Sequence, residues 1–311
     1  MKQFKTSVLT TAILLVLFSC KEISAPIEIT TDHFHTSIDK VVEVMIHDIF
    51  SPPVASRVFV YPNIAAYEIL AQNDSTYSSL KNQINHLGAI PSPNQPTKIN
   101  YPLAALIAHI HLSKQLIFSE AKIEKHRDSL YNVWEATNPR EFRESKAYGL
   151  EVAAYITDWM NKDNYAQTRT MPKFSVDSND EGRWQPTPPS YMDGLEPHWD
   201  KIRSFVLESA DQFKPVPPPK FSMNKDSDFY KELVEVYEIS KEITKKGDSS
   251  EEIAIAQFWD CNPYVSVTRG HLMFAVKKIT PGAHWIGITK IAAKKEKADF
   301  NRTVFAYTKT S

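Results

Sequence analysis

Gly182-Arg183-Trp184-Gln185-Pro186-Thr187-Pro188-Pro189 opens a proline- and tryptophan-rich stretch that continues through Pro197-His198-Trp199 and closes at Phe213-Lys214-Pro215-Val216-Pro217-Pro218-Pro219. Nine of the chain's 20 prolines lie between Pro172 and Pro219. Because proline lacks an amide donor and fixes φ, this stretch is neither a helix interior nor a central strand. It also carries aromatic rings that a disordered linker lacks, namely Trp184, Tyr191, Trp199, Phe205 and Phe213. We therefore expect an ordered extended strap, about residues 165–222, whose rings pack onto a helical body.

The N-terminus has the pattern of a targeting segment. Lys2 and Lys5 precede an apolar run from Val8 to Phe18, which is too short to span a bilayer. The run ends in Leu17-Phe18-Ser19-Cys20, the order of residues at a bacterial lipoprotein cleavage site. We expect residues 1–19 to be a signal peptide, Cys20 to be lipidated, and residues 20–35 to be an extended tether. The protein would then be attached to a membrane of the bacterial cell envelope, periplasmic or surface-facing.

Composition narrows the function and the fold. The formal net charge of the chain is −1 at pH 7 and no long block of like charge occurs, so nothing indicates nucleic acid as a partner. Only two cysteines are present, Cys20 and Cys261, and a lipidated Cys20 excludes an intrachain disulfide. Glycine is scarce, with 8 residues, and no phosphate-binding glycine loop or zinc-binding motif is found. These observations favour an all-helical chain, with residues 36–311 as one domain. They leave its oligomeric state open.

Helical periodicity recurs along the chain. A break is expected at Pro52-Pro53, a kink or restart at Pro62, and a polar loop over residues 73–100. Ser222 or Asp226 can cap a helix that ends at Gly247, and Ser249 with Glu252 forms a capping-box pattern. The predicted helices are Asp39–Phe50, Pro53–Ile69, Leu103–Phe118, Glu120–Trp134, Glu141–Met160, a helix of about 20 residues before Gly247, one through Ile253–Trp259, Leu272–Ile279 and Trp285–Lys294.

Histidine pairs are the first candidates for a metal site. His109 and His111 lie two apart in a predicted helix, so they point in different directions and cannot share a metal. His33 and His35 precede the first predicted helix and would share a face of an extended segment, but no third ligand is nearby. We predict no metal site.

Two further sets of residues could take part in chemistry. Glu251 and Glu252 could act as acid and base, but adjacent carboxylates at a helix N-terminus more often serve as caps and dipole partners. Arg183 could bind an anion, but stacking on an aromatic ring is the simpler interpretation.

The strap and the segments after it resemble the vanadium-dependent haloperoxidases within the type 2 phosphatidic acid phosphatase superfamily. The matching residues are Gly182-Arg183-Trp184-x-Pro186, Pro197-His198-Trp199, Phe213-x-Pro215-x-Pro217-Pro218-Pro219, Glu251-x-Ile253-Ala254, Ala256-x-Phe258-Trp259 and Thr280-Pro281-Gly282-x-His284-Trp285, with Ser56-Arg57 and Ala65-Ala66-Tyr67-Glu68 earlier. The resemblance implies a helical bundle with a site for phosphate or vanadate. In haloperoxidases, bound vanadate takes up hydrogen peroxide and oxidises halide.

The oxyanion motifs of that family cannot be placed in this chain. Lys295 and Arg302 have the family's spacing, but Thr303 stands where proline is required. Thr268-Arg269-Gly270-His271 contains Gly-His with arginine in place of serine. The two matches also occur in the wrong order. We therefore assign no catalytic, cofactor-binding or metal-binding residue, and Cys20 is the only modified position expected.

These observations predict the N-terminal scaffold of a haloperoxidase-like or acid-phosphatase-like envelope lipoprotein, inactive as this chain and incomplete at its C-terminus. No cofactor is expected in this chain, whereas vanadate is expected for a full-length haloperoxidase relative. Missing helices would leave apolar surface exposed on Leu103–Phe118 or on Leu272–Trp285. The alternative is a non-enzymatic helical lipoprotein that binds glycan or peptide through its aromatic strap.

Overall fold

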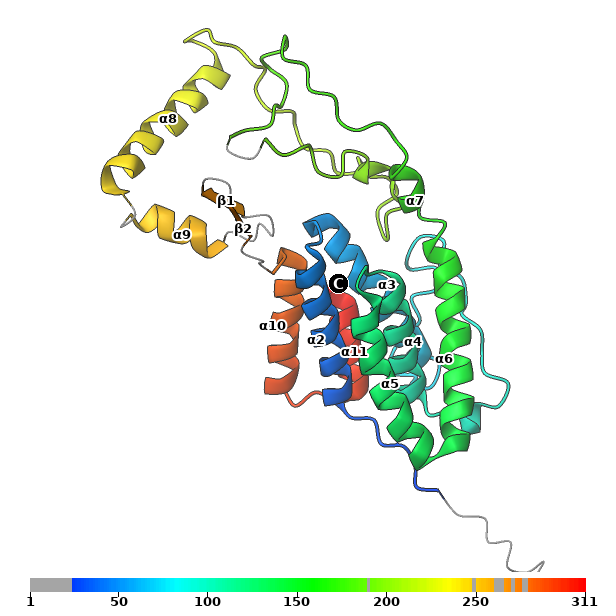
Figure 1. Cartoon of the computed structure of the whole chain (residues 1–311). Coiled ribbons are helices and arrows are strands. Elements are labelled where there is room, and N and C mark those ends of the chain that lie inside the picture. The colour runs from blue at the N-terminus through cyan, green and yellow to red at the C-terminus, as the bar shows by residue number, and fades with distance from the viewer. Residues whose placement is uncertain (1–23, 189–190, 248–249, 260–265, 270–271, 276–278) are drawn as a thin grey trace, which may run out of the picture.

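The computed structural model describes residues 24–188, 191–247, 250–259, 266–269, 272–275 and 279–311. A helical body and a projecting arm make up this part of the chain (Figure 1). The body contains α2 (Thr31–Asp48), α3 (Pro52–Ala71), α4 (Tyr101–Gln115), α5 (Glu120–Thr137), α6 (Pro139–Met160), α10 (Pro281–Lys295) and α11 (Phe300–Thr310), with a short 3-10 helix at Pro96–Lys98. The arm contains the strap, with α7 (Tyr165–Thr168) and a 3-10 turn (Trp199–Lys201), followed by α8 (Asp228–Lys246) and α9 (Glu251–Trp259).

The all-helical expectation is confirmed for the architecture, with one local exception. β1 (Ser266–Arg269) and β2 (Leu272–Ala275) pair as a short antiparallel hairpin between α9 and α10. The prediction of a helix over Leu272–Ile279 is therefore wrong. Among the described residues, no helix has both the length and the apolar character needed to cross a bilayer.

α4 is the centre of the body. Its sequence is apolar on all sides, and such a helix is stable only when it is surrounded. α3 and α6 pack along it, and α2 and α5 cover the remaining faces. Leu103, Leu106 and Ile107 have no exposed surface. Of the two segments expected to expose apolar surface, Leu103–Phe118 is covered along α4 by these four helices, although Phe118 beyond the helix is 78% exposed.

α3 passes through Pro62 as one continuous helix, so of the expected kink or restart, the restart is wrong. Proline removes one backbone hydrogen bond, which tertiary packing can outweigh. Every residue from Val58 to Leu70 is buried, and this packing holds the helix together on both sides of Pro62.

The predicted tether over residues 20–35 is wrong for its second half. α2 begins at Thr31, and Phe34 is fully buried. The residues before α2 are also fixed to the body, because Ile27 donates its N–H to Glu141 and accepts a bond from the Asn100 amide. Residues 1–23 lie outside the described residues.

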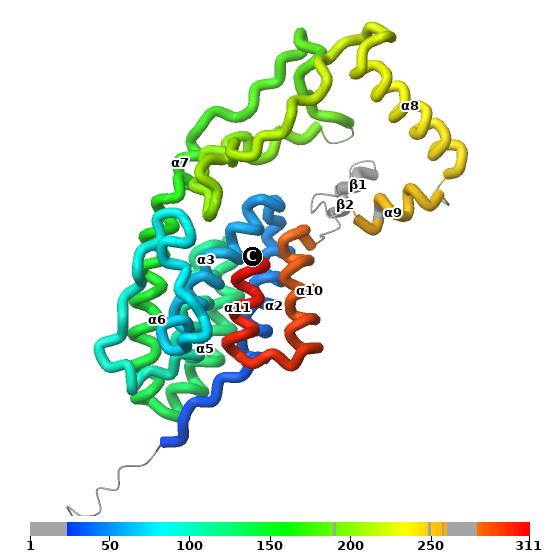
Figure 2. Tube along the Cα trace, turned by 180° about the vertical axis from the view of Figure 1, so that it is seen from behind, coloured from blue at the N-terminus to red at the C-terminus, as the bar shows by residue number. Residues whose placement is uncertain are grey.

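α11 completes the body and was not predicted from the sequence. It packs against α2, α3 and α10, and the C-terminus lies within the body in both views (Figures 1 and 2). Tyr307 is fully buried and its hydroxyl bonds to His35 Nδ1 at 2.7 Å. Thr308 donates to the backbone carbonyl of Asn63. These bonds join the C-terminal helix to the first two helices of the body.

The helices of the arm begin and end close to the predicted positions. Gly247 ends α8 with a positive φ of 65°, as expected for a glycine at that position. The N-terminal cap of α8 is Ser227, which accepts the N–H of Tyr230. Ser250 caps α9 by accepting the N–H of Ile253. The predicted caps Ser222 and Asp226 are thus wrong by one to five residues, and Ser249 lies outside the described residues.

Among the described residues, two rings of the strap contact the body: Tyr165 lies against Arg57, and Phe205 lies further along the strap. Phe205 contacts Tyr61 and Trp159 of the body. Trp184 packs on Phe174 within the strap and remains 50% exposed, whereas Phe213 is 77% exposed. The strap is extended as predicted, but most of it stands away from the body (Figure 2).

Candidate functional site

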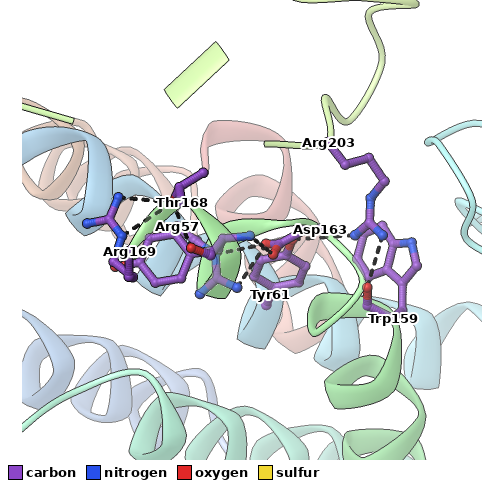
Figure 3. A network of polar contacts seen from close by, with 8 residues as sticks. Arg57, Tyr61, Trp159, Asp163, Thr168, Arg169 and Arg203 are labelled. Atoms are coloured by element: carbon purple, nitrogen blue, oxygen red, sulfur yellow. Dashed lines mark hydrogen bonds and ion pairs between the residues drawn. The ribbon is translucent and has the colours of Figure 1, made fainter. Parts of the chain in front are cut away.

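The strap meets the body at one buried carboxylate, Asp163 (Figure 3). Asp163 follows the last turn of α6, and its side chain is 1% exposed. Its Oδ2 accepts bonds from Arg57 Nε at 2.9 Å and from the Tyr61 hydroxyl at 2.7 Å, while Oδ1 accepts the Tyr165 N–H at 2.8 Å. Arg57 and Tyr61 lie one turn apart on α3 and therefore share a face. Asp163 thus ties α3 to the start of the strap.

Arg57 is held in this site by charge and by aromatic rings. Its terminal nitrogen lies 2.8 Å from Asp163 Oδ2, and its side chain is 10% exposed. The guanidinium also stacks on Tyr165, 4.1 Å from the ring centre. Burial, first of all, and the negative charge of Asp163 raise the pKa of Tyr61, so its hydroxyl stays protonated and donates to the carboxylate.

Arg203 forms a second contact between the strap and the end of α6. Its backbone N–H donates to the Asp163 carbonyl, and its guanidinium donates to the Trp159 carbonyl at 2.9 Å. The guanidinium also lies over the Trp159 ring, 4.4 Å from its centre (Figure 3). The strap is therefore bound to the end of α6 at two points, Tyr165 and Arg203.

A second ion pair joins two segments of the strap. Arg169 pairs with Glu196 through both terminal nitrogens and stacks on Tyr165 at 4.6 Å. The ion pair raises the pKa of Arg169. Behind it the strap encloses a cavity of about 420 Å³, whose lining includes Met171, Phe174 and Met192.

A cavity of about 400 Å³ lies beside Arg203. It is lined by His86, Tyr155, Asp158, Trp159, Lys162 and Arg203. Arg203 Nε is buried here without a hydrogen-bond partner. The cavity thus has a basic lining, which the carboxylate of Asp158 partly offsets.

The two histidines of each predicted pair contact different residues. His109 is buried and bonds to Ser37 Oγ, and burial lowers the pKa of His109 to about 3. His111 bonds to Gln115 near the surface. His33 caps α2, and His35, on the same helix, turns toward Tyr307. The extended segment expected for His33 and His35 is wrong, because α2 already includes both. No cluster of three potential ligands from His, Cys, Asp and Glu occurs in the part of the chain that the structure describes.

The remaining candidate residues lie apart from this junction. Glu252 pairs with Lys246 at 2.6 Å, which lowers the pKa of Glu252 at the start of α9. Arg183 stacks on Phe174, so the expected stacking is found on a different ring from the neighbouring Trp184. Lys295 and Arg302 are both exposed, on α10 and α11. Cys20, His271 and Cys261 lie outside the described residues.

Sequence reasoning missed the centre of this junction. Arg57 was noted only as part of a family pattern, and Asp163 looks like an ordinary turn residue after a helix. They are separated by 106 positions, so only the folded chain brings them together.

The described residues form a mainly helical body with an extended strap. No family model matches the sequence, and no curated protein matches it. A solved structure of a bacterial vanadium-dependent iodoperoxidase matches with 64% sequence identity and a TM-score of 0.85. The match covers 92% of this chain and 66% of that chain, so this chain spans just under two thirds of its relative.

This chain belongs to the vanadium-dependent haloperoxidase superfamily. The comparison also corrects one expectation. We expected no cofactor in this chain, but the similar protein, which is 64% identical over 92% of this chain, is vanadium-dependent. This similarity contradicts the expectation that the chain has no cofactor.

The described residues can be tested for their fit to vanadate, a compact oxyanion that needs several converging donors. Arg57 is already paired with Asp163, and Arg169 with Glu196. Arg203 donates to the Trp159 carbonyl and the Tyr61 hydroxyl, its Nε has no partner, and its cavity also contains the Asp158 carboxylate. These groups do not form an oxyanion cradle, and we derive no chemical step through vanadate from them.

Proposed function

We propose that this chain forms the supporting helical part of a vanadium-dependent haloperoxidase-like protein. The observation that carries the proposal is the 64% identity to a vanadium-dependent iodoperoxidase over 92% of this chain. Iodide is the first candidate halide, by similarity to that protein. Bound vanadate supplies peroxide activation in such enzymes, and the residues of this chain supply its surroundings.

The contacts of the described residues support a scaffold role. α4 is enclosed by four helices, which makes the body rigid. Asp163 binds α3 and two points of the strap: its carboxylate accepts from Arg57 and from the Tyr165 N–H, and its backbone carbonyl accepts the Arg203 N–H. The basic groups at this junction are used for structure: Arg57 and Arg169 are ion-paired, and Arg203 is stacked and hydrogen-bonded.

A halide-oxidation assay tests this proposal. Purified residues 21–311, incubated with vanadate, hydrogen peroxide and iodide, are expected to form triiodide no faster than a mixture without protein. The bacterial iodoperoxidase assayed in parallel shows that the conditions support turnover. Vanadate-dependent turnover by residues 21–311 at an enzymatic rate would contradict the scaffold role.

The alternative is a protein that binds glycan or peptide through its strap. One observation favours it, the cavity of about 420 Å³ within the strap. Apolar and charged groups both line this cavity, as is common in binding sites for small ligands. The contacts of the strap with the body around Asp163 favour the scaffold role over this alternative.

We also propose that Cys20 carries a lipid that attaches the protein to a membrane of the bacterial envelope. The support is the residue pattern before Cys20 together with the place where the described chain begins. Residues 24–30 run along the turn between α5 and α6, at the end of the body opposite the arm (Figure 1). The arm would then project away from the membrane.

Replacing the lipidated cysteine tests this attachment. In a bacterial host, the full chain is expected in the membrane fraction, and the Cys20→Ser variant in the soluble fraction, because the acyl chains are lost. Cys261→Ser is the matched control and is expected to stay with the membrane. A Cys20→Ser protein that still sediments with membranes would exclude Cys20 as the anchor.

A further inference from the structure

α8 is a helix that this chain leaves without packing. It is 19 residues long and none of its residues is buried. A helix of this length is marginal in water without tertiary contacts, since most helical stability in proteins comes from a packed apolar face. In both views α8 stands away from the body (Figures 1 and 2).

α8 has an apolar face that one polar residue interrupts. Phe229, Leu233 and Val236 follow the three- and four-residue spacing of a helix–helix seam, Ser240 occupies the next seam position and Ile243 the one after it, and Tyr237 lies beside them. Leu233 is 39% exposed, Val236 66% and Tyr237 58%. Such a stripe is stable when another helix packs along it.

The charges of α8 are complementary to those of its own reversed copy. From Asp228 to Glu238 the helix has four acidic residues and one lysine. From Ile239 to Lys246 it has three lysines and one acidic residue. Two copies packed antiparallel would place each acidic half against a basic half, whereas parallel copies would place like charges together.

The same charges disfavour a lipid surface as the occupant. Helices that lie on membranes carry an excess of Lys and Arg on their polar face. α8 has five acidic residues and four lysines. It also lies at the end of the body opposite residues 24–30, which follow the proposed lipid anchor (Figure 1).

We propose that the apolar face of α8 is a dimerisation surface on which a second copy of this chain packs antiparallel. The two-fold axis passes near Val236, so that Phe229 of each copy meets Ile243 of the other. Asp228 then lies near Lys245 of the second copy. This inference is independent of the haloperoxidase function, because none of these residues belongs to the junction around Asp163.

The mass in solution tests the proposal. A single helix pair is a small interface, so dimer formation is expected between roughly 1 and 100 µM. Sedimentation velocity is expected to show a dimer of residues 21–311 in that range, and a monomer for Leu233→Asp/Val236→Asp. Val133→Asp is the matched control: Val133 is 61% exposed on α5, so this variant is expected to remain dimeric.

Charge exchange tests the antiparallel pairing. One variant, Asp228→Lys/Glu232→Lys, makes both halves of α8 basic, and another, Lys241→Glu/Lys245→Glu, makes both acidic. Each is expected to be monomeric alone, and the tagged basic variant is expected to retain the untagged acidic variant on a column.

Four outcomes would overturn the proposal. These are a wild-type monomer at 100 µM, a dimer that persists in Leu233→Asp/Val236→Asp, charge variants that do not pair, and a monomer whose α8 is protected from hydrogen exchange only after lipid vesicles or another protein are added.

Discussion

Replacing Asp163 with alanine is expected to lower the free energy of unfolding by roughly 3–5 kcal/mol, the usual cost of leaving a buried charge without its partner. Arg57 is only 10% exposed and would keep its charge in place. The hydroxyl of Tyr61 and the N–H of Tyr165 would lose their acceptor as well. Urea unfolding followed by circular dichroism measures this loss.

Two comparisons separate this cost from the general effect of removing a carboxylate. Glu43→Ala breaks an exposed ion pair with Lys40 and is expected to cost no more than about 1 kcal/mol. Arg57→Met/Asp163→Ala removes both charges, so it is expected to be more stable than Asp163→Ala alone. A loss below about 1 kcal/mol for Asp163→Ala would mean that water reaches Arg57 and that this junction does not hold the strap.

The body helices could be predicted because their apolar residues recur at helical spacing over many turns. Residues 103–118, rich in Ala, Leu and Ile, indicated a central helix, and α4 lies at the centre of the body. Gly247 marked the end of α8, because only glycine readily adopts the backbone conformation found there. These sequence patterns depend only on neighbouring residues, so they predict local structure without knowledge of the tertiary contacts.

The errors share a physical cause. Each concerns a segment whose structure depends on contacts with residues far away in the sequence. α11 has only 11 residues, and its apolar positions Phe300, Val304 and Tyr307 gave a short pattern. Its stability comes from contacts with α2 and α3, which are far away in sequence. Residues 20–35 were likewise predicted to be an extended tether, yet Phe34 lies in α2 and is buried against His109 and Tyr307.

The strap shows the limit of composition as evidence. Its prolines correctly excluded a helix interior, but its rings did not reveal their partners. Phe205 reaches the body because Arg203 is bound to Asp163 and Trp159 two residues earlier. Phe213 has no such neighbour and stays exposed. The site at Asp163 could not be predicted, because its parts come from α3, the end of α6 and the strap.

Exposed apolar surface was predicted on Leu103–Phe118 or on Leu272–Trp285, and the second segment does expose Trp285. α4 is covered, whereas α8 has no buried residue and Trp285 of α10 is 59% exposed. The physical reasoning was sound, because a helix made amphipathic by its sequence needs a partner. Which helix lacks that partner depends on how the chain is folded.

Replacing Gly149 with alanine is expected to destabilise the protein by roughly 1–3 kcal/mol, the usual cost of overpacking a core. Gly149 lies on α6 where this helix crosses α4. An added Cβ would lie 2.6 Å from the Ala104 carbonyl oxygen, and its next two contacts, at 3.3 Å, are also backbone atoms of Ala104. Backbone cannot rotate away as a side chain can, so α4 and α6 would have to move apart.

The same substitution at Gly287 is expected to have the opposite sign. Gly287 lies inside α10, and a Cβ there would meet no atom within 4 Å. Gly287→Ala is therefore expected to stabilise the protein by about 0.5–1 kcal/mol, since alanine loses less backbone entropy in a helix. Because that gain applies at Gly149 too, the difference between the two variants measures the close approach of α4 and α6. If Gly149→Ala unfolded at the same urea concentration as Gly287→Ala, the two helices would not be in the contact that builds the core of this body.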